Sequence, residues 1–223
     1  MIAADLPIPR VWAIVPVKRL SLAKQRLAPV LTDGLRAALA LAMLADLFEL
    51  LKELPFLAGI AVVSNDARVR AMAPAGALLL NDPTESGTNS AVQHGLRMVE
   101  PLHSDALMIL PSDIPFAQAS ELLKVAQALE NESLIIVPDR RGVGTNLLAG
   151  YRFDAMDTSF GVDSFKRHVS NAMAIGMTPR VLEFPGIGWD VDLPEDLHVD
   201  EVLSCYSSGR HTRAFLSRIA VSA

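Results

Sequence analysis

The chain has 223 residues, of which 51% are hydrophobic, and it carries a formal net charge of −5 at pH 7. This length and composition are typical of one α/β domain with a substantial core, and the negative charge argues against a general nucleic-acid-binding protein. No apolar run reaches the roughly 18 residues of a membrane span, the first residues lack a signal-peptide pattern, and the single cysteine, Cys205, excludes an intrachain disulfide. We therefore expect a cytoplasmic protein with no membrane or nucleic-acid partner.

Short apolar runs alternate with helical patterns along the chain. The runs at 11–17, 59–64, 77–80 and 106–110 predict buried strands, and 133–137, 146–149 and 180–184 predict further strands. Helical patterns occupy 33–54, 88–99, 118–130 and 162–176, a short helix follows Asp66, and another begins at Pro194. This alternation predicts one three-layer α/β/α domain over residues 1–223 with a mostly parallel sheet, in which the turn-rich segment 135–184 forms a substrate-binding lobe.

Three aspartates lie where predicted strands end. Asp113 follows the strand at 106–110, and Asp190 and Asp192 lie two residues apart on an extended segment, which points both side chains to one side. Open α/β sheets place their chemistry beyond the carboxyl ends of their strands. Because Mg²⁺ prefers oxygen ligands, we predict that Asp113, Asp190 and Asp192 hold Mg²⁺ next to a phosphate-bearing substrate.

A basic loop follows the first strand. The segment from Arg10 to Arg26 contains five basic residues and no acidic one. Lys18, Lys24 and Arg26 would neutralise a triphosphate there, although a solvated basic loop explains the charges equally well. The loop has neither a Walker A pattern nor a G-x-G-x-x-G fingerprint, so a P-loop and a Rossmann dinucleotide site are not supported.

Other candidate binding residues lie at loop-to-helix junctions, and each of them has two possible interpretations. Gly87 and Asn89 open a helix whose amides could face a nucleotide, but ordinary capping by Thr88 is an equal alternative. Asp66 and Asp82 could accept the N–H groups of guanine, but each is more simply a surface aspartate. The histidines lack metal-ligand spacing and no G-x-S-x-G elbow is present, which argues against a zinc site and a serine nucleophile.

Four motifs occur in order along the chain: 14–18 with 23–27, Gly144–Leu148, Phe160–Phe165 with His168, and 190–197. Together they resemble the motifs of the guanylyltransferases of deazaflavin coenzyme F-420 biosynthesis. Their order and spacing match over nearly the whole chain. The resemblance implies a Rossmann-like fold of the nucleotide-diphospho-sugar transferase type, as in molybdopterin guanylyltransferases. The first loop departs from the glycine-rich loop of that wider superfamily, so its lysines and arginine would do more of the phosphate binding.

The resemblance also implies a reaction. The family moves GMP from GTP onto the phosphate of 2-phospho-L-lactate, phosphoenolpyruvate or 3-phospho-D-glycerate and releases pyrophosphate. We accordingly expect residues 1 to about 130 to bind GTP and residues from about 131 to 223 to bind the acceptor. Ser164 alone would be interpreted as a helix cap, but with the resemblance we assign Thr145, Gly161 and Ser164 to the acceptor, and Lys24 to catalysis with the three aspartates.

Two other functions stay open at this point. One is a different nucleotidyltransferase that uses CTP or a molybdopterin-type acceptor, and the other is a nucleotide-binding module that has lost catalysis. Retention of all three aspartates argues against the second. The expected partners are therefore GTP and a small phosphorylated carboxylic acid, with a homodimer left open.

Overall fold

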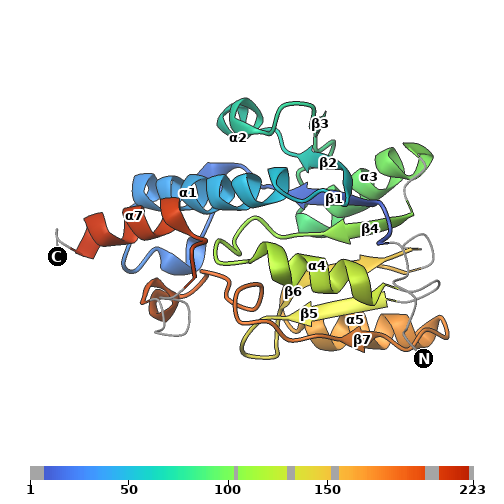
Figure 1. The fold of residues 1–223 in the computed structure, drawn as a ribbon. Helices are drawn as coiled ribbons and strands as arrows, with labels where there is room; N and C mark the ends of the chain where they lie inside the picture. The colour runs from blue at the N-terminus through green and yellow to red at the C-terminus, as the bar shows by residue number, and fades with distance from the viewer. Residues whose placement is uncertain (1–7, 103–104, 130–133, 152–155, 199–205, 221–223) are drawn as a thin grey trace.

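A single seven-stranded sheet forms the centre of the molecule (Figure 1). The computed structural model describes residues 8–102, 105–129, 134–151, 156–198 and 206–220. Its strands lie in the order β3-β2-β1-β4-β6-β5-β7. The bounds are β1 (Val11–Pro16), β2 (Leu57–Val63), β3 (Leu78–Leu80), β4 (Ala106–Ile109), β5 (Leu134–Pro138), β6 (Thr145–Gly150) and β7 (Arg180–Val181). Of the strands in the described residues, only β6 runs antiparallel to its neighbours, so the predicted mostly parallel sheet is confirmed.

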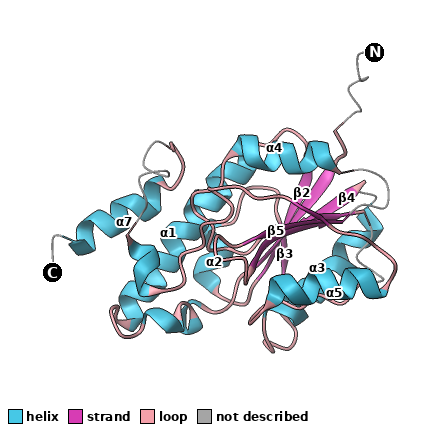
Figure 2. Cartoon of the chain, turned by 90° about the horizontal axis from the view of Figure 1, so that it is seen from below, coloured by secondary structure: helices cyan, strands magenta, loops and turns pink. Residues whose placement is uncertain are grey.

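Helices cover both faces of this sheet (Figure 2). They are α1 (Asp33–Lys52), α2 (Ala67–Met72), α3 (Thr88–Val99), α4 (Ala119–Ala128), α5 (Ser164–Ala174) and α7 (Arg210–Ala220). Alternate residues of each strand face opposite layers, as an extended backbone requires. In β1, Ala13 and Val15 pack in the cluster that contains α1 and α4, while Ile14 packs in the cluster that contains α3. The predicted three-layer architecture follows from this burial on both faces.

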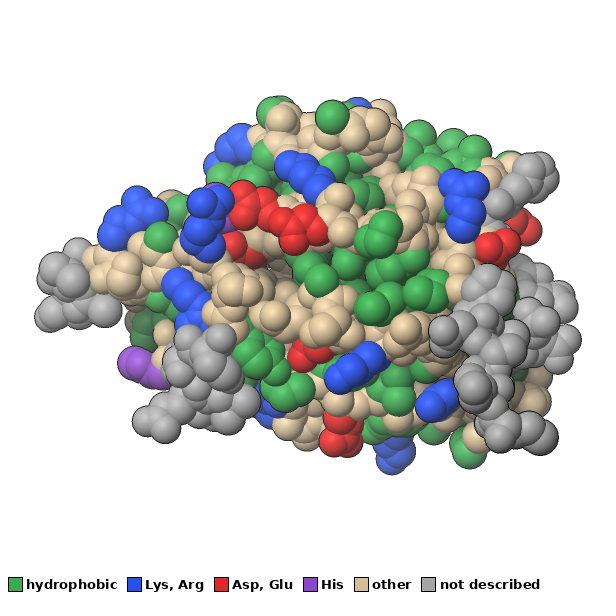
Figure 3. Space-filling model, viewed as in Figure 1, with side chains coloured by type: hydrophobic (Ala, Val, Ile, Leu, Met, Phe, Trp, Pro, Cys, Tyr) green, Lys and Arg blue, Asp and Glu red, His purple; other side chains and the backbone are tan. Residues whose placement is uncertain are grey.

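The last described helix is fixed to the first one. Both carboxylate oxygens of Asp46 in α1 accept backbone N–H groups at the start of α7, from His211 and Thr212, at 2.8 Å each. Acidic and basic side chains also lie together over the α1–α7 end of the molecule (Figure 3), where Glu49 Oε1 is 2.9 Å from Arg210 Nη2. In the part of the chain that the structure describes, no helix has the length and apolar character needed to cross a membrane.

The C-terminal third differs from its prediction in three places. The predicted strand at 180–184 is ordered as a strand only at Arg180–Val181, because the chain leaves the sheet edge for a turn at 185–188. The segment around Val191 joins no strand; its backbone N–H donates to the carbonyl of Asp113 at 3.1 Å instead. The helix predicted from Pro194 begins as a 3-10 turn, Pro194–Leu197, and residues 199–205 of the predicted helix lie outside the described residues.

The predicted turn-rich lobe supplies β5, β6 and β7 to the same sheet. Three positions used in the sequence analysis, Cys205, Glu130 and Ser133, lie outside the described residues.

Candidate active site

Strand direction brings distant segments to one edge of the sheet. Ile109 of β4 pairs with Leu148 of β6. Because β6 is antiparallel, its first residue, Thr145, lies at the edge where β1 and β4 end. The basic loop after β1, Asp113 after β4 and the start of β6 therefore meet there, as expected for an open α/β sheet.

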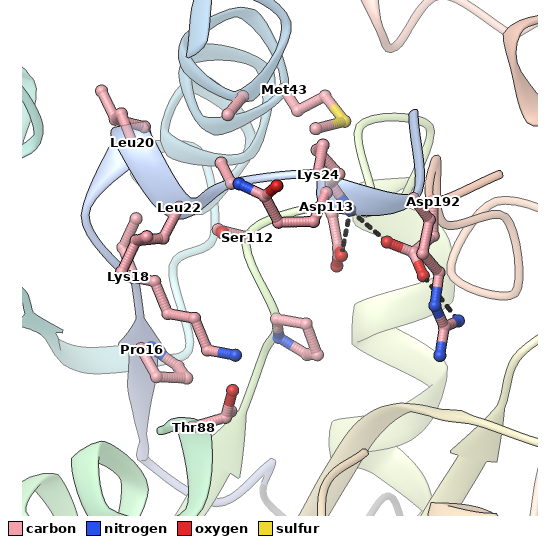
Figure 4. Close-up of a pocket in the computed structure, with 16 residues that line it drawn as sticks. Pro16, Lys18, Leu20, Leu22, Lys24, Met43, Thr88, Ser112, Asp113 and Asp192 are labelled. Carbon is pink, nitrogen blue, oxygen red and sulfur yellow. Dashed lines mark hydrogen bonds and ion pairs between the residues drawn. The ribbon is translucent and has the colours of Figure 1, made fainter. Parts of the chain in front are cut away.

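Lys24 lies at the centre of this edge (Figure 4). Its Nζ is 2.5 Å from Asp113 Oδ2 and 3.5 Å from Asp192 Oδ1, and its side chain is only 8% exposed. Burial disfavours the charge of Lys24, but the Asp113 and Asp192 carboxylates outweigh burial and raise its pKa. A left-handed backbone at Lys24, with φ of 51°, turns the loop at this point. The structure thus brings a buried cation and two of the predicted carboxylates into direct contact.

The other predicted charges surround this contact. Arg26 Nη1 lies 2.9 Å from the second oxygen of Asp192. Asp190 accepts a 3.3 Å hydrogen bond from the side-chain amide of Asn146, which also donates to the Ile187 carbonyl at 2.9 Å. Burial, and then the charge of Asp113, raise the pKa of Asp190 to about 6. The electrostatic cost of gathering these carboxylates indicates that the edge is arranged to receive positive charge.

Asp196 organises the segment that carries Asp190 and Asp192. Its Oδ2 accepts the backbone N–H groups of Asp192 at 2.9 Å and Leu193 at 2.7 Å. Its Oδ1 pairs with the guanidinium groups of Arg140 and Arg141. Although burial opposes ionisation, the backbone bonds from Leu193 and Asp192, together with Arg141, lower the pKa of Asp196. Asp196 therefore holds the segment of the aspartate pair in place.

A cavity of about 360 Å³ opens beside Lys24. Residues from the basic loop, from Thr88 at the start of α3 and from Ser112 and Asp113 line it. Lys18 extends into the space toward Thr88 (Figure 4). Lys18, Lys24, Arg26, Asp113 and Asp192, five of the predicted site residues, thus share one cavity.

Thr145, one of the three residues predicted to bind the acceptor, is held by a buried histidine. His168 of α5 is fully buried, and its Nε2 accepts the backbone N–H of Ser159 at 2.8 Å. In the neutral ring the proton is then on Nδ1, which donates to Thr145 Oγ1 at 2.9 Å. The Thr145 hydroxyl is left with its own hydrogen to donate elsewhere. Burial, with a smaller effect of Arg167, lowers the pKa of His168 to about 4, so the ring stays neutral.

The helix starts differ from simple side-chain capping. The N-cap of α3 is Gly87, whose φ of 123° favours glycine, and the N-cap of α5 is Asp163 with φ of 53°. Neither residue makes a side-chain cap bond, and Ser164 and Thr88 are the first helical residues rather than caps. No capping side chain occupies the first amides of either helix, but in α5 the N–H groups of Ser164 and Phe165 already donate to the carbonyls of Gly161 at 3.1 Å and Val143 at 3.0 Å.

Asn89 connects the two predicted binding regions. Its Oδ1 accepts the N–H of Phe160 at 2.6 Å and its Nδ2 donates to the Phe160 carbonyl at 3.1 Å. Phe160 precedes Gly161, one of the residues assigned to the acceptor. The side chain of Asn89, predicted at the nucleotide, therefore ties the start of α3 to the acceptor loop.

Several supporting residues carry no predicted role. They are Asn146, His168, Arg140, Arg141 and, as the anchor of the aspartate pair, Asp196. Asn146 and His168 stand inside the motifs that carry the family resemblance, which was the available signal. The two arginines lie in a turn-rich segment far from Asp196 in sequence, so no local pattern indicated their contact.

Comparison with known proteins decides the family. The family model described as "Guanylyl transferase CofC like" matches residues 11–223. The chain belongs to this family. This guanylyl transferase is 35% identical over 213 residues to the phosphoenolpyruvate guanylyltransferase of Conexibacter woesei, covering 93% of the chain and 96% of the relative. It is 33% identical over 212 residues to the Streptomyces coelicolor enzyme of the same name, covering 94% and 97%.

Solved structures agree on the fold of this guanylyl transferase. A putative nucleotide-diphospho-sugar transferase from Desulfovibrio desulfuricans G20 superposes with a TM-score of 0.71 at 19% identity, covering 93% of this chain and 97% of that one. A cytidylyltransferase from Leptospira borgpetersenii gives a TM-score of 0.59 at 12% identity, covering 96% of each chain. The Rossmann-like nucleotide-diphospho-sugar transferase fold is thereby confirmed.

The three aspartates suit Mg²⁺ in chemistry but are spread apart. Among the described residues, the one trio of potential ligands whose atoms all lie within 4.8 Å of one another is Asp46, Glu49 and His211. Mg²⁺ usually keeps several waters and takes only one or two carboxylates. The approach of one ammonium to both Asp113 and Asp192 shows that these two carboxylates already converge on a cation.

Proposed function

We propose that this guanylyl transferase joins GMP from GTP to phosphoenolpyruvate and releases pyrophosphate, as a step in coenzyme F-420 biosynthesis. The observation that carries the proposal is the cavity at the sheet edge, which brings Lys18, Lys24 and Arg26 together with two aspartates. The names of the relatives from Conexibacter woesei and Streptomyces coelicolor support phosphoenolpyruvate over the other two acids. Their identity over nearly the whole length supports the same reaction class here.

The chemistry is an in-line displacement at phosphorus. An oxygen of the acceptor phosphate attacks the α-phosphorus of GTP, a P–O bond to the acceptor forms, and the bond to the β-phosphate oxygen breaks. A phosphomonoester has a second pKa near about 6, so the acceptor is already an anionic nucleophile at neutral pH. No strong general base is needed. The main barrier is the repulsion between two polyanions.

The positive charges of the basic loop would reduce this repulsion. Lys18 reaches into the cavity and would neutralise the triphosphate, and Lys24 and Arg26 would stabilise the departing pyrophosphate. Asp113, Asp190 and Asp192 would hold Mg²⁺, which when bound would screen the remaining charge and orient the phosphates. Thr145, through its hydroxyl hydrogen, and the loop that carries Gly161 and Ser164 would bind the acceptor.

A competition assay tests the proposal. The purified protein is given GTP, Mg²⁺ and equal amounts of phosphoenolpyruvate, 2-phospho-L-lactate and 3-phospho-D-glycerate, and the products are separated by mass. We expect the guanosine product of phosphoenolpyruvate to dominate and to disappear when EDTA removes the metal. Dominance of another acceptor's product would contradict the assignment. Release of no pyrophosphate with any acceptor would support a binding module instead.

A matched aspartate provides the control for the site. Asp105 precedes β4, at the opposite edge of the sheet from Asp113, and accepts the Arg10 N–H at 2.9 Å. Asp105→Asn keeps an acceptor oxygen, so turnover should stay near that of the unchanged protein. Loss of turnover in Asp113→Asn alone would then reflect the site rather than a general effect of replacing aspartate.

A further inference from the structure

A second cavity continues from the first. It measures about 280 Å³ and is lined by the loop after β1, by Asn65, and by Asp82, Glu85, Ser86 and Gly87. Val17, Lys18 and Leu22 line both cavities, so the two adjoin. An elongated ligand with its phosphates near Lys18 would place its other end here. The inference below rests on the proposed function, because it takes that ligand to be a nucleoside triphosphate.

Asp66 and Asp82, the two aspartates that the sequence suggested for guanine binding, accept hydrogen bonds from backbone N–H groups. Asp82 Oδ1 accepts the backbone N–H groups of Thr84 at 3.2 Å and Glu85 at 3.0 Å. Asp66 accepts the N–H of Arg68 at 3.0 Å and, with its other oxygen, that of Leu20 at 3.0 Å. Asp82 thus shapes its own loop, whereas Asp66 caps the start of α2 and ties it to the loop after β1. These backbone contacts give both carboxylates a structural role.

Glu85 differs because its carboxylate is held only by side chains. Arg19 Nη2 and Nε lie 2.7 and 2.8 Å from its two oxygens, a bidentate pair, and Asn65 Nδ2 donates to it at 2.6 Å. A left-handed backbone with φ of 49° presents this residue at the cavity wall. The hydrogen bonds from Arg19 and then Asn65 lower the pKa of Glu85 to about 2, so the carboxylate is ionised at neutral pH.

The partner of this carboxylate is chemically similar to guanine. A guanidinium offers two parallel N–H groups to a carboxylate, and the N1–H and N2–H groups of guanine offer the same fork. The Arg19 and Glu85 side chains are 51% and 39% exposed. An ion pair this exposed contributes little to stability and opens at low cost. The carboxylate can therefore exchange the guanidinium for a base edge of matching shape.

We propose that Glu85 recognises the N1–H and N2–H edge of guanine, and that Arg19 occupies this carboxylate until the base displaces it. Adenine presents an unprotonated ring nitrogen at the corresponding position, which a carboxylate repels. Hypoxanthine keeps the N1–H but lacks the amino group, so it makes only half of the fork. The ratio of the affinities for GTP and for ITP therefore measures how much the hydrogen bond from the guanine amino group to Glu85 contributes to binding.

The experiment removes the Arg19–Glu85 ion pair in two ways, by replacing either the carboxylate or the guanidinium. Dissociation constants for GTP and ITP are measured without acceptor on the unchanged protein, on Glu85→Gln and on Arg19→Gln. Losing a hydrogen bond to a charged group costs about ten- to hundredfold in affinity, so the unchanged protein should prefer GTP to ITP by about that factor. The preference should fall toward one in Glu85→Gln and persist in Arg19→Gln, since Arg19 only covers the carboxylate.

Two results would overturn the inference. One is an unchanged GTP-to-ITP ratio in Glu85→Gln, including the case where both affinities fall together, because that is what a purely structural role produces. The other is loss of the ratio in Arg19→Gln alone. Glu85→Asp, which keeps the charge and shortens the side chain, serves if the glutamine variant does not fold, and should give an intermediate ratio. Because binding is read without acceptor, a failure of guanylyl transfer itself would appear separately, in the turnover assay.

Discussion

The buried His168 should make the stability of this protein depend on pH in a way that one substitution removes. The pKa of His168 is about 4 in the folded protein against an ordinary value of 6.5. At a pH between these two pKa values, His168 is protonated in the unfolded chain and neutral in the folded protein. The free energy of unfolding therefore rises with pH across this window, and the contribution of His168 is lost progressively as the pH falls from about 6.5 to about 4.

The size of the effect follows from the two pKa values. Linkage between pKa values of 6.5 and about 4 gives a loss of about 2 kcal/mol between pH 8 and pH 5, and a further loss down to pH 4. The neutral ring is required by both of its contacts, because Nε2 must stay unprotonated to accept the Ser159 N–H. Protonation would break that bond and leave a charge with no solvent contact.

Urea unfolding at pH 8, 7, 6 and 5 measures this effect on the unchanged protein and on His168→Gln. At pH 8 the variant should be less stable, since Thr145 and Ser159 lose well-placed partners. At pH 5 the gap should narrow by about 2 kcal/mol, because glutamine has nothing to titrate. Carboxylates elsewhere titrate in both proteins and cancel in the difference. An equal gap at pH 8 and pH 5 would refute the reasoning.

Three further predictions concern turnover. Replacing any one of the three aspartates by asparagine (Asp113→Asn, Asp190→Asn or Asp192→Asn) should lower kcat by about 100-fold or more, the usual cost of losing one group that stabilises charge in the transition state. The circular dichroism spectrum should not change. Near-normal activity in a variant would remove that residue from the site. Lys24→Ala should raise the KM for GTP more than that for the acceptor, and the reverse pattern in initial rates would contradict its place on the nucleotide side. Thr145→Val should raise the acceptor KM about ten- to hundredfold with little change for GTP, and an unaffected acceptor KM would exclude its hydroxyl from binding.

The fold was largely predictable because its strands are buried on both faces. Runs such as Val11–Val17 and Ala106–Leu110 contain almost no polar residue, so they could be placed without knowledge of their neighbours. Prediction failed where backbone hydrogen bonds come from outside the sheet. The segment around Val191 has a strand-like sequence, but its N–H donates to the Asp113 carbonyl, a long-range contact that no local pattern encodes.

The sequence predicted several residues that meet at the cavity, but not which of them contact one another. Charged residues after strands identified Lys24, Asp113 and Asp192, and the structure places them together. Their mutual contacts depend on strand order, since β4 lies next to β1 only in the folded sheet. The burial of His168 also depends on tertiary packing, because its helical pattern alone did not show what α5 covers. The roles of these residues toward GTP, the acceptor and Mg²⁺ stay predictions.

The contact between Lys24 and Asp192 joins positions 168 residues apart. During synthesis on the ribosome, the basic loop and β1 emerge long before the segment that carries Asp190 and Asp192. A nascent chain that has reached β6 can pair most of its sheet, yet Lys24 then has only Asp113 as a counter-charge. The cluster of Lys24 with its carboxylates is thus completed last, when translation is nearly over. A protein truncated before residue 190 would keep all seven strands that the structure describes and still lack Asp190 and Asp192.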